Sequence, residues 1–148
     1  MSSNYSPSND ACSINISVAN NTSHVFSQTD IWRHHGKTVN NPVSSILGDS
    51  AETLIATFGK ESGYGPLGLL KYTSDDGTVL IIYYNNPEVG ETTTSTAEAN
   101  QWFYAILQPP SGKGTSYYLE VSGFTMNLNG SGESEEVMNP VITINLFT

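Results

Sequence analysis

Charge is scarce in this sequence, and positive charge above all. Charged residues make up 13% of the 148 residues, about half of the roughly 25% that is usual in globular proteins. Five are Lys or Arg and 14 are Asp or Glu, which gives a net charge of −9. Cations that neutralise phosphates supply most of the affinity for nucleic acid, and basic segments supply the attraction to anionic lipid. The composition therefore excludes both as partners.

Cysteine and long apolar runs are also missing. Cys12 is the only cysteine, so neither an internal disulfide nor a cysteine metal cluster can form. The longest apolar stretch, residues 79–84, is far shorter than the roughly 18 residues of a membrane-spanning helix. Residues 1–10 have neither the basic cluster nor the apolar core of a signal peptide. We expect synthesis in the cytoplasm without a signal peptide, with later release and action at a target-cell membrane as an open alternative.

What the sequence does contain is a series of short strand-like segments between polar turns. Apolar and polar residues alternate at 14–18 and at 141–147, which is typical of strands with one buried face. Residues 78–84 are almost continuously apolar, which predicts a central strand covered on both faces. The pair Asp76-Gly77 lies between two apolar runs. It predicts a tight hairpin, because glycine accepts positive φ.

These segments predict one all-β domain. We expect a single-domain β-sandwich of roughly eight to ten strands with one or two short helices, one of them within residues 95–99. Residues 1–12 are polar and turn-rich, so we expect them to form a flexible N-terminal lead. The sandwich domain is expected to span residues 13–148.

No set of residues forms a convincing catalytic or metal site. Gly63, Gly65 and Gly68 match a dinucleotide-binding pattern, but a strand-like run follows where a helix is required, which favours a glycine-rich turn with close backbone approach. Adjacent His34 and His35 are expected on opposite faces of a strand. The carboxylate pairs lie in turns rather than in a cleft that could shift a pKa. We expect a protein that is not an enzyme, with no metal and no cofactor.

Aromatic residues are numerous for so polar a chain. Successive side chains of a strand face opposite sides, so at least one aromatic in residues 102–104, and one in the pair Tyr117-Tyr118, should reach the surface. Trp102, Phe103, Tyr117 and Tyr118 are therefore candidate binding residues. Exposed Trp and Tyr beside Asn, Ser and Gly suit a sugar ring, a zwitterionic lipid head group or a protein partner.

Residues 68–87 resemble a hairpin of the actinoporin-like cytolysins and of their relatives, the aegerolysins. The shared pattern is a glycine, two apolar residues and a tyrosine, then Asp-Gly, an apolar strand and a proline, here Gly68, Tyr72, Asp76, Gly77 and Pro87. Weaker similarity runs through most of residues 14–147. Fungal fruit-body lectins share the same broad sandwich.

The resemblance implies a β-sandwich that binds membrane lipid. In actinoporins, a phosphocholine pocket uses positions that match Leu67, Asn85 and Pro87 here. Their membrane-facing tryptophan cluster most nearly matches Trp102 and Phe103. The N-terminal lead is too short and too polar for the amphipathic helix with which actinoporins form a pore. The sequence is closer to aegerolysins, which bind sphingolipid-containing membranes, some of them together with a perforin-like protein that makes the pore.

The resulting hypothesis is a non-enzymatic, cytolysin-like protein that recognises a zwitterionic sphingolipid head group, of sphingomyelin or ceramide phosphoethanolamine type. It would be the binding component of a pore-forming toxin, with a second perforin-like protein as partner. A carbohydrate-binding lectin that takes a glycan is the first alternative, and a structural or assembly protein is the second; a homo-oligomer is compatible with each. Because cations are few, binding should depend only weakly on salt.

Overall fold

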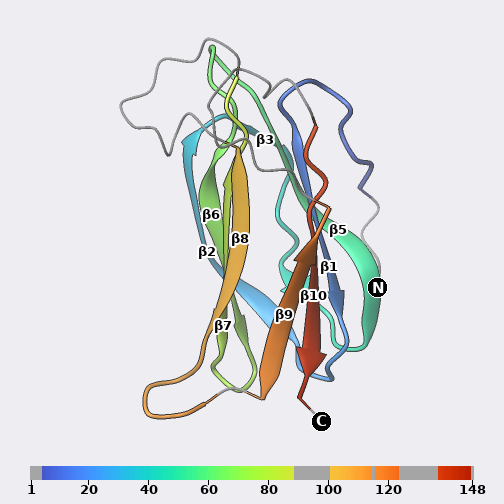
Figure 1. The fold of residues 1–148 in the computed structure, drawn as a ribbon, viewed down its shortest axis with the longest axis vertical. Coiled ribbons are helices and arrows are strands. Elements are labelled where there is room, and N and C mark those ends of the chain that lie inside the picture. Colours follow the sequence, from blue (N-terminus) through green and yellow to red (C-terminus); the bar gives the residue numbers. More distant parts are fainter. Residues whose placement is uncertain (1–4, 89–100, 115, 124–136, 148) are drawn as a thin grey trace.

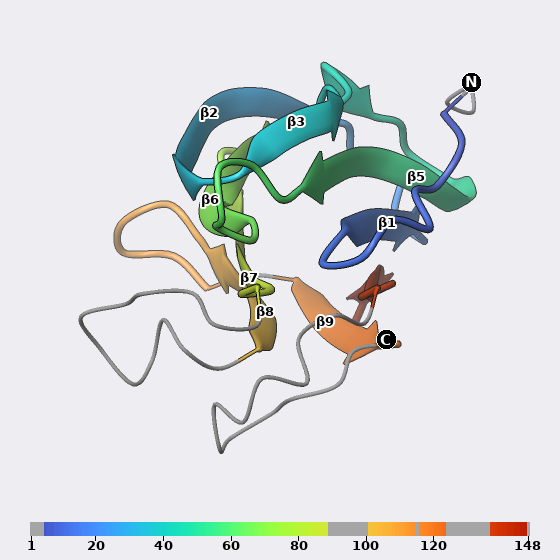
Figure 2. The same cartoon turned by 90° about the horizontal axis from the view of Figure 1, so that it is seen from above.

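The computed structural model describes residues 5–88, 101–114, 116–123 and 137–147. They form ten strands in two five-stranded sheets that stack face to face, as Figure 1 and Figure 2 show. The strands are β1 (Ile14–Asn20), β2 (Phe26–His35), β3 (Lys37–Asn40), β4 (Ser45–Ile46), β5 (Ser50–Gly59), β6 (Leu67–Ser74), β7 (Val79–Asn85), β8 (Trp102–Gln108), β9 (Tyr117–Ser122) and β10 (Val141–Leu146). The described residues contain no helix, and the helix expected within residues 95–99 lies outside them. The predicted all-β sandwich is confirmed.

The two sheets differ in topology. The β1 sheet has the strand order β3-β5-β1-β10-β9, and the β7 sheet has the order β4-β2-β6-β7-β8. Neighbouring strands pair antiparallel except β1 and β10, which run parallel. The strands run along the length of the sandwich in Figure 1. The sandwich therefore has an upper end, where β7 ends and β8 begins, and a lower end, where β6 turns into β7.

Alternating apolar side chains fill the space between the sheets. β1 contributes Ile14, Ile16 and Val18, each 0% exposed. Phe58 of the β1 sheet and Tyr84 of the β7 sheet stack with ring centroids 4.6 Å apart. Full burial of one such side chain stabilises a fold by about 1.5–3 kcal/mol. The two sheets are therefore held together by apolar contact.

The hairpin predicted at Asp76-Gly77 is confirmed as the connection from β6 to β7. Gly77 has a φ of +90°, and its amide donates to the Ser74 carbonyl over 3.0 Å. β7 lies next to the edge strand β8, and its outward residues Val79 and Tyr83 are only half-buried. β7 has a strand on either side, and its third outward residue, Ile81, is 6% exposed. The prediction of a central strand is therefore confirmed, whereas full cover of both faces is wrong at Val79 and Tyr83.

Residues 6–8 lie against the outside of the β1 sheet, whereas residues 12 and 13 are buried. The Ser8 amide donates to Asn15 Oδ1 over 2.8 Å, and Asn15 Nδ2 donates back to the Ser8 carbonyl over 2.9 Å. Cys12 is fully buried, with its Sγ 3.8 Å from the carbonyl oxygen of Pro87. Cys12 thus belongs to the packed interior, which corrects its expected place in a flexible lead. The domain boundary at residue 13 stays a prediction.

Candidate functional site

The strand register brings three of the predicted binding residues into one row. Leu67 of β6 pairs with Asn85 of β7, and Asn85 pairs with Trp102 of β8. Phe103 follows Trp102 on β8, and Pro87 comes two residues after the end of β7. These five residues therefore gather at the upper end of the β7 sheet.

Most of the five side chains are covered by protein. Leu67 is 6% exposed, Asn85 is 2% exposed and Phe103 is 1% exposed. Pro87 is also buried, whereas Trp102 is half-buried. The structure therefore gives Trp102 direct access to a ligand. Contact of the four buried residues with a head group stays a prediction.

A buried amide network fixes the chain next to this row. Asn86 Nδ2 donates to the Ser13 carbonyl over 3.1 Å, and Gln101 Nε2 donates to Asn86 Oδ1 over 2.8 Å. A Cβ at Gly65 would lie 1.9 Å from the Asn86 carbonyl oxygen, which confirms the close backbone approach predicted for the glycine-rich turn. The network holds the start of β8, so that Trp102 points outward.

Tyr117 and Tyr118 lie at the opposite, lower end. β9 begins with Tyr117, which is 1% exposed and packs edge-to-face on Phe26 with ring centroids 6.0 Å apart. Tyr118 is 39% exposed and contacts Phe147. The prediction that one of the pair reaches the surface is confirmed. The length of β6, about 23 Å at 3.3 Å per residue, separates this end from the row at Leu67, so the structure does not bring the two sets together.

A larger set of side chains covers the outer face of the β7 sheet. Trp32, Leu69, Tyr83 and Tyr104 are direct partners across β2, β6, β7 and β8. Trp102 and Ile106 extend this row along β8, two residues to either side of Tyr104. Trp32 is 51% exposed, Tyr104 is 48% exposed and Ile106 is 45% exposed. We call this set the aromatic face; it comprises Trp32, Leu69, Tyr83, Trp102, Tyr104 and Ile106.

Ring contacts hold the aromatic face in place. Tyr83 and Tyr104 stack with centroids 4.8 Å apart and an interplanar angle of 29°. Trp102 contacts Tyr104 at 5.6 Å, and Trp32 stacks on His34 at 5.2 Å and 17°. Such contacts contribute about 0.5–1.5 kcal/mol beyond simple burial. They fix the rings while leaving their outward surfaces accessible, so the platform is already formed before a ligand arrives.

Sequence reasoning found part of this face. The prediction that residues 102–104 send an aromatic outward is confirmed, because Tyr104 is exposed whereas Phe103 is buried. Trp32, Tyr83 and Ile106 were missed as surface residues. Period-two alternation shows which residues of one strand share a face, but it does not show which strands are neighbours.

The upper end of β2 departs from the regular strand pattern. A register shift separates Arg33 from His35 in the pairing with β6. The rings of His34 and His35 lie with centroids 4.2 Å apart, so the expectation that they occupy opposite faces is wrong. The described part of the chain holds no group of three or more His, Cys, Asp or Glu side chains placed to bind a metal ion.

The lower end carries a polar cluster around the β6–β7 hairpin. Asp76 accepts hydrogen bonds from Tyr117 Oη over 2.5 Å, from the Thr78 amide over 3.0 Å and from Ser74 Oγ. Partial desolvation raises the pKa of Asp76, but these hydrogen bonds outweigh it and hold that pKa well below its usual range. Burial, with the contact to Asp76, raises the pKa of Tyr117 well above its usual value. Neither group lies near the neutral pKa that acid–base catalysis uses.

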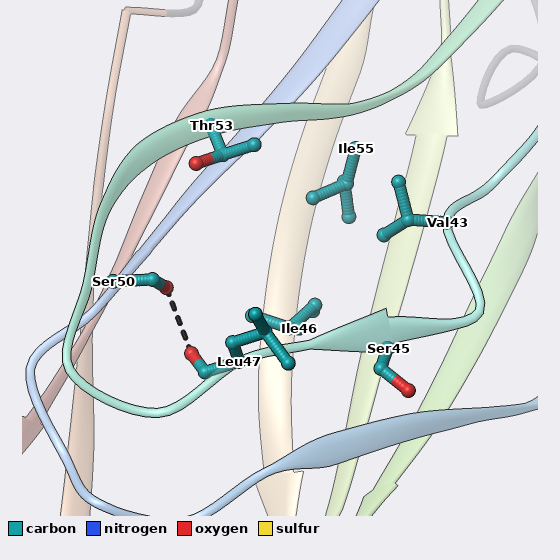
Figure 3. A pocket seen from close by; sticks show the side chains of 7 residues that line it. All are labelled: Val43, Ser45, Ile46, Leu47, Ser50, Thr53 and Ile55. Atoms are coloured by element: carbon teal, nitrogen blue, oxygen red, sulfur yellow. Dashed lines mark hydrogen bonds between the residues drawn. The ribbon is translucent and has the colours of Figure 1, made fainter. Parts of the chain in front are cut away.

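A small cavity lies beside β4 and β5, as Figure 3 shows. Its volume is about 30 Å³, and its lining consists of Val43, Ser45, Ile46, Leu47, Ser50, Thr53 and Ile55. Ser50 Oγ donates to the Leu47 carbonyl over 2.8 Å. One water molecule has a share of about 30 Å³ in the liquid. The cavity is therefore too small for a sugar ring or a lipid head group.

Among the residues that the structure describes, no helix is long and apolar enough to cross a membrane. No known protein family matches the sequence, and no curated protein matches it. The chain is instead similar to known proteins in its three-dimensional structure.

Several solved structures share this fold, and three of them are Nakanori, RahU and IP-1A. The lipid-binding protein Nakanori is 10% identical, with a TM-score of 0.61, over 90% of this chain and 70% of that chain. The RahU protein, solved in complex with a TRIS molecule, is 11% identical, with a TM-score of 0.57, over 92% and 96%. IP-1A from Alcaligenes faecalis is 19% identical, with a TM-score of 0.58, over 95% and 94%. At these identities the likeness shows the fold, one that carries lipid binding in Nakanori.

Proposed function

We propose that this protein binds membrane lipid through the aromatic face and recognises a zwitterionic sphingolipid head group, of sphingomyelin or ceramide phosphoethanolamine type. The observation that carries the proposal is the outward row of Trp32, Leu69, Tyr83 and Tyr104 across four strands. The protein acts by binding rather than by catalysis. Its role is that of an aegerolysin-like binding component, with a second, perforin-like protein for any pore.

The chemistry of the exposed rings supports a membrane partner. Trp and Tyr concentrate at membrane interfaces because their rings are apolar and their N–H or O–H groups reach the head groups. Trp32 and Tyr104 offer half of their surface to solvent. A contiguous exposed apolar patch on a soluble domain marks an interaction site more often than chance. The rings therefore suit the boundary between acyl chains and head groups.

The shape and charge of the molecule favour shallow binding to neutral lipid. The row from Trp32 to Tyr104 spans three strand spacings, about 14 Å, so several rings reach a flat surface together. The net charge of −9 opposes binding to anionic membranes. Zwitterionic head groups carry no such penalty. The fold shared with the lipid-binding protein Nakanori adds support at the level of architecture.

Co-sedimentation with vesicles tests the proposal. Three compositions are compared: phosphatidylcholine alone, phosphatidylcholine with sphingomyelin, and phosphatidylcholine with ceramide phosphoethanolamine. We expect binding to at least one sphingolipid mixture and weaker binding to phosphatidylcholine alone. No binding to any of the three would contradict the proposal.

A pair of double variants tests the location. Trp32→Ala with Tyr104→Ala is expected to weaken vesicle binding about 100-fold, because two ring insertions of ~1.5 kcal/mol each are lost. The matched control is Tyr118→Ala with Phe147→Ala, which also removes two exposed rings, 39% and 62% exposed, but from the lower end of the other sheet. We expect the control to bind as the wild type does. An equal loss in both would show that the aromatic face is not the site.

Carbohydrate binding is the second candidate function, because exposed Trp and Tyr rings also stack on sugar rings. A glycan array on the wild type and on the Trp32→Ala, Tyr104→Ala variant separates the two. Glycan hits that vanish in the variant, with no vesicle binding, would assign a lectin. Stable self-association without lipid or glycan binding, measured by analytical ultracentrifugation, would instead assign an assembly role.

A further inference from the structure

A second concave feature lies at the edge of the β1 sheet. It forms where the N-terminal segment passes β3 and the end of β5. Its volume is about 340 Å³, and its lining consists of Asp10, Ala11, Ser13, Lys37, Val39, Gly59 and Lys60. Pockets for small ligands start at roughly 300 Å³, so this cleft has room for a phosphorylated head group.

The charges in the cleft are unusual for this chain. Lys37 and Lys60 are two of its five cations, and both line the same cleft. Lys37 is exposed, and no ion pair joins it to a described residue. Lys60 Nζ lies 3.1 Å from Glu88 Oε1. Asp10 supplies the one carboxylate among the lining residues, so cationic and anionic groups share one concavity.

Backbone geometry keeps the cleft open. Lys37 pairs with Gly59 across β3 and β5. A Cβ at Gly59 would lie 3.3 Å from Val39 Cγ2 and 3.8 Å from Lys37 Cε, so any side chain there would project into the space beside the lysine. Glycine at this position therefore preserves room for a ligand next to Lys37.

The strand that carries Lys37 follows directly on a strand of the other sheet. β2 of the β7 sheet ends at His35, and β3 of the β1 sheet begins at Lys37. Gly36 joins them with a φ of +89°, and a Cβ there would lie 2.6 Å from the Gly59 carbonyl oxygen. His35 stacks on Tyr64 with centroids 4.2 Å apart. Lys37 thus follows the stacked ring of His35 by two residues.

We propose that this cleft binds the phosphate of a phosphocholine or phosphoethanolamine group, with Lys37 and Lys60 on the phosphate oxygens and Asp10 toward the ammonium. Contacts between a lysine ammonium group and a phosphate oxygen are charge-assisted hydrogen bonds, about twice as strong as neutral ones. A carboxylate beside them favours a zwitterion over a plain anion. The assignment of this group to a lipid rests on the proposed function, whereas the phosphate site itself does not.

Soluble ligands test the cleft apart from membranes. Phosphocholine and inorganic phosphate are titrated into the full-length protein, followed by NMR of the Lys37 and Gly59 amides. We expect phosphocholine to bind more tightly than phosphate and to shift both amides. Lys37→Gln with Lys60→Gln should weaken phosphocholine at least tenfold. Lys113→Gln, which removes a cation from the exposed β8–β9 loop, is the control and should change nothing.

Two further variants should change the affinity for phosphocholine in opposite directions. Asp10→Asn should weaken phosphocholine and tighten inorganic phosphate, because only the former carries an ammonium. Glu88→Gln removes the carboxylate paired with Lys60 and should tighten both ligands. If Lys60 served only to hold Glu88, Glu88→Gln would weaken binding as much as Lys60→Gln does, which would overturn the assignment. Thermal unfolding of each variant checks folding, and Lys37→Gln alone retains the test if Lys60→Gln unfolds the protein.

Vesicle binding by the same variants separates the two proposals. If the wild type binds sphingolipid vesicles and Lys37→Gln with Lys60→Gln binds them equally well, the assignment of the head group to the cleft is overturned. The membrane proposal would then remain intact. Lysine-dependent phosphocholine binding without any vesicle binding would support the cleft as a site for a soluble phosphorylated ligand and overturn the membrane proposal. Reduced binding of both vesicles and phosphocholine supports the cleft as the head-group site.

Discussion

On the outside of the β1 sheet, polar side chains of β1, β3 and β5 bind one another, whereas on the outside of the β7 sheet, rings of β2 and β8 face outward. Thr57 Oγ1 donates to Asn15 Oδ1 over 3.0 Å, and Asn40 Nδ2 donates to Thr57 Oγ1 over 2.9 Å. The outer face of the other sheet carries Trp32 and Tyr104, about half exposed. Both faces come from strands of similar length and alternation.

The difference shows which face is complete within the chain. Buried polar groups need hydrogen-bond partners, and the β1 sheet supplies them from its own side chains and from the N-terminal segment. The rings of the β7 sheet contact one another sideways, and Trp32 and Tyr104 stay about half exposed. This exposed apolar surface is why we propose lipid binding there rather than on the polar face.

The largest expected effect comes from a substitution in the polar face of the β1 sheet. Asn15 is 3% exposed and hydrogen-bonds Ser8, Thr57 and Asn139. Asn15→Ala leaves these groups without a partner, so we expect a loss of about 3 kcal/mol in the free energy of unfolding, measured by urea denaturation. Vesicle binding below the unfolding temperature should persist. Asn145→Ala, in an exposed amide network, serves as control and should cost less than about 1 kcal/mol.

A smaller effect is expected at Asp76 of the β6–β7 hairpin, where polar side chains also hydrogen-bond one another. The low pKa of Asp76 means that its ionised form stabilises the folded state. This contribution is complete above its unfolded pKa of 3.8 and is lost as the pH falls below that value. Asp76→Asn should lower stability at pH 7 by about 1 kcal/mol, a discounted figure because the carboxylate is exposed.

Thermal unfolding of Asp76→Asn and the wild type at pH 7 and pH 3 checks this prediction. The gap between the two proteins should narrow at pH 3, because the Asp76 carboxylate of the unfolded wild-type chain is then largely protonated, which favours unfolding. A gap that stays constant between the two pH values would contradict the role assigned to the charge.

Tyr84 extends the comparison to a buried polar group on the inner side of the β7 sheet. Its Oη is fully buried and has no hydrogen-bond partner among the described residues. Removing an unsatisfied hydroxyl relieves its desolvation cost, so Tyr84→Phe should raise the free energy of unfolding by up to about 1 kcal/mol. Phe keeps the stack on Phe58. Chemical denaturation measures the change; a loss above that size would mean that the hydroxyl is satisfied.

The smallest expected effect concerns salt. Ring insertion is not screened by ions, whereas lysine–phosphate contact is partly screened. Raising NaCl from about 0.1 M to 1 M should therefore weaken wild-type vesicle binding by no more than about fivefold. The remaining salt dependence should disappear in Lys37→Gln with Lys60→Gln. Strong salt inhibition would point to an electrostatic membrane contact and away from the aromatic face.

The sequence predicted the fold where local pattern decides it. The alternation of Ile14, Ile16 and Val18 and the turn at Asp76-Gly77 are local, and both are confirmed. The outer surface of β7 was misjudged because an apolar residue such as Tyr83 looks the same whether a layer or only a neighbouring strand covers it. Cys12 was misjudged because its burial depends on Pro87, far along the chain.

The candidate site was predictable only in part. Trp102 was found because alternation forces an aromatic of residues 102–104 outward. Trp32 and Tyr104 become one surface only when β2, β6, β7 and β8 are placed side by side. The cleft at Lys37 and Lys60 depends on a segment that crosses a sheet edge, an arrangement without any periodic pattern in the sequence.

The parallel pairing of β1 with β10 also governs how the chain reaches its native state. Ser17 pairs with Val141, so the β1 sheet joins segments from opposite ends of the folded region. Contacts between such distant residues form late, since loop-closure entropy must be overcome first, and folding slows accordingly. Until β10 arrives, the β1 edge stays unpaired and prone to association with other chains. A ribosome-bound or truncated chain that lacks β10 is therefore the species most exposed to aggregation, while the completed molecule has closed that edge.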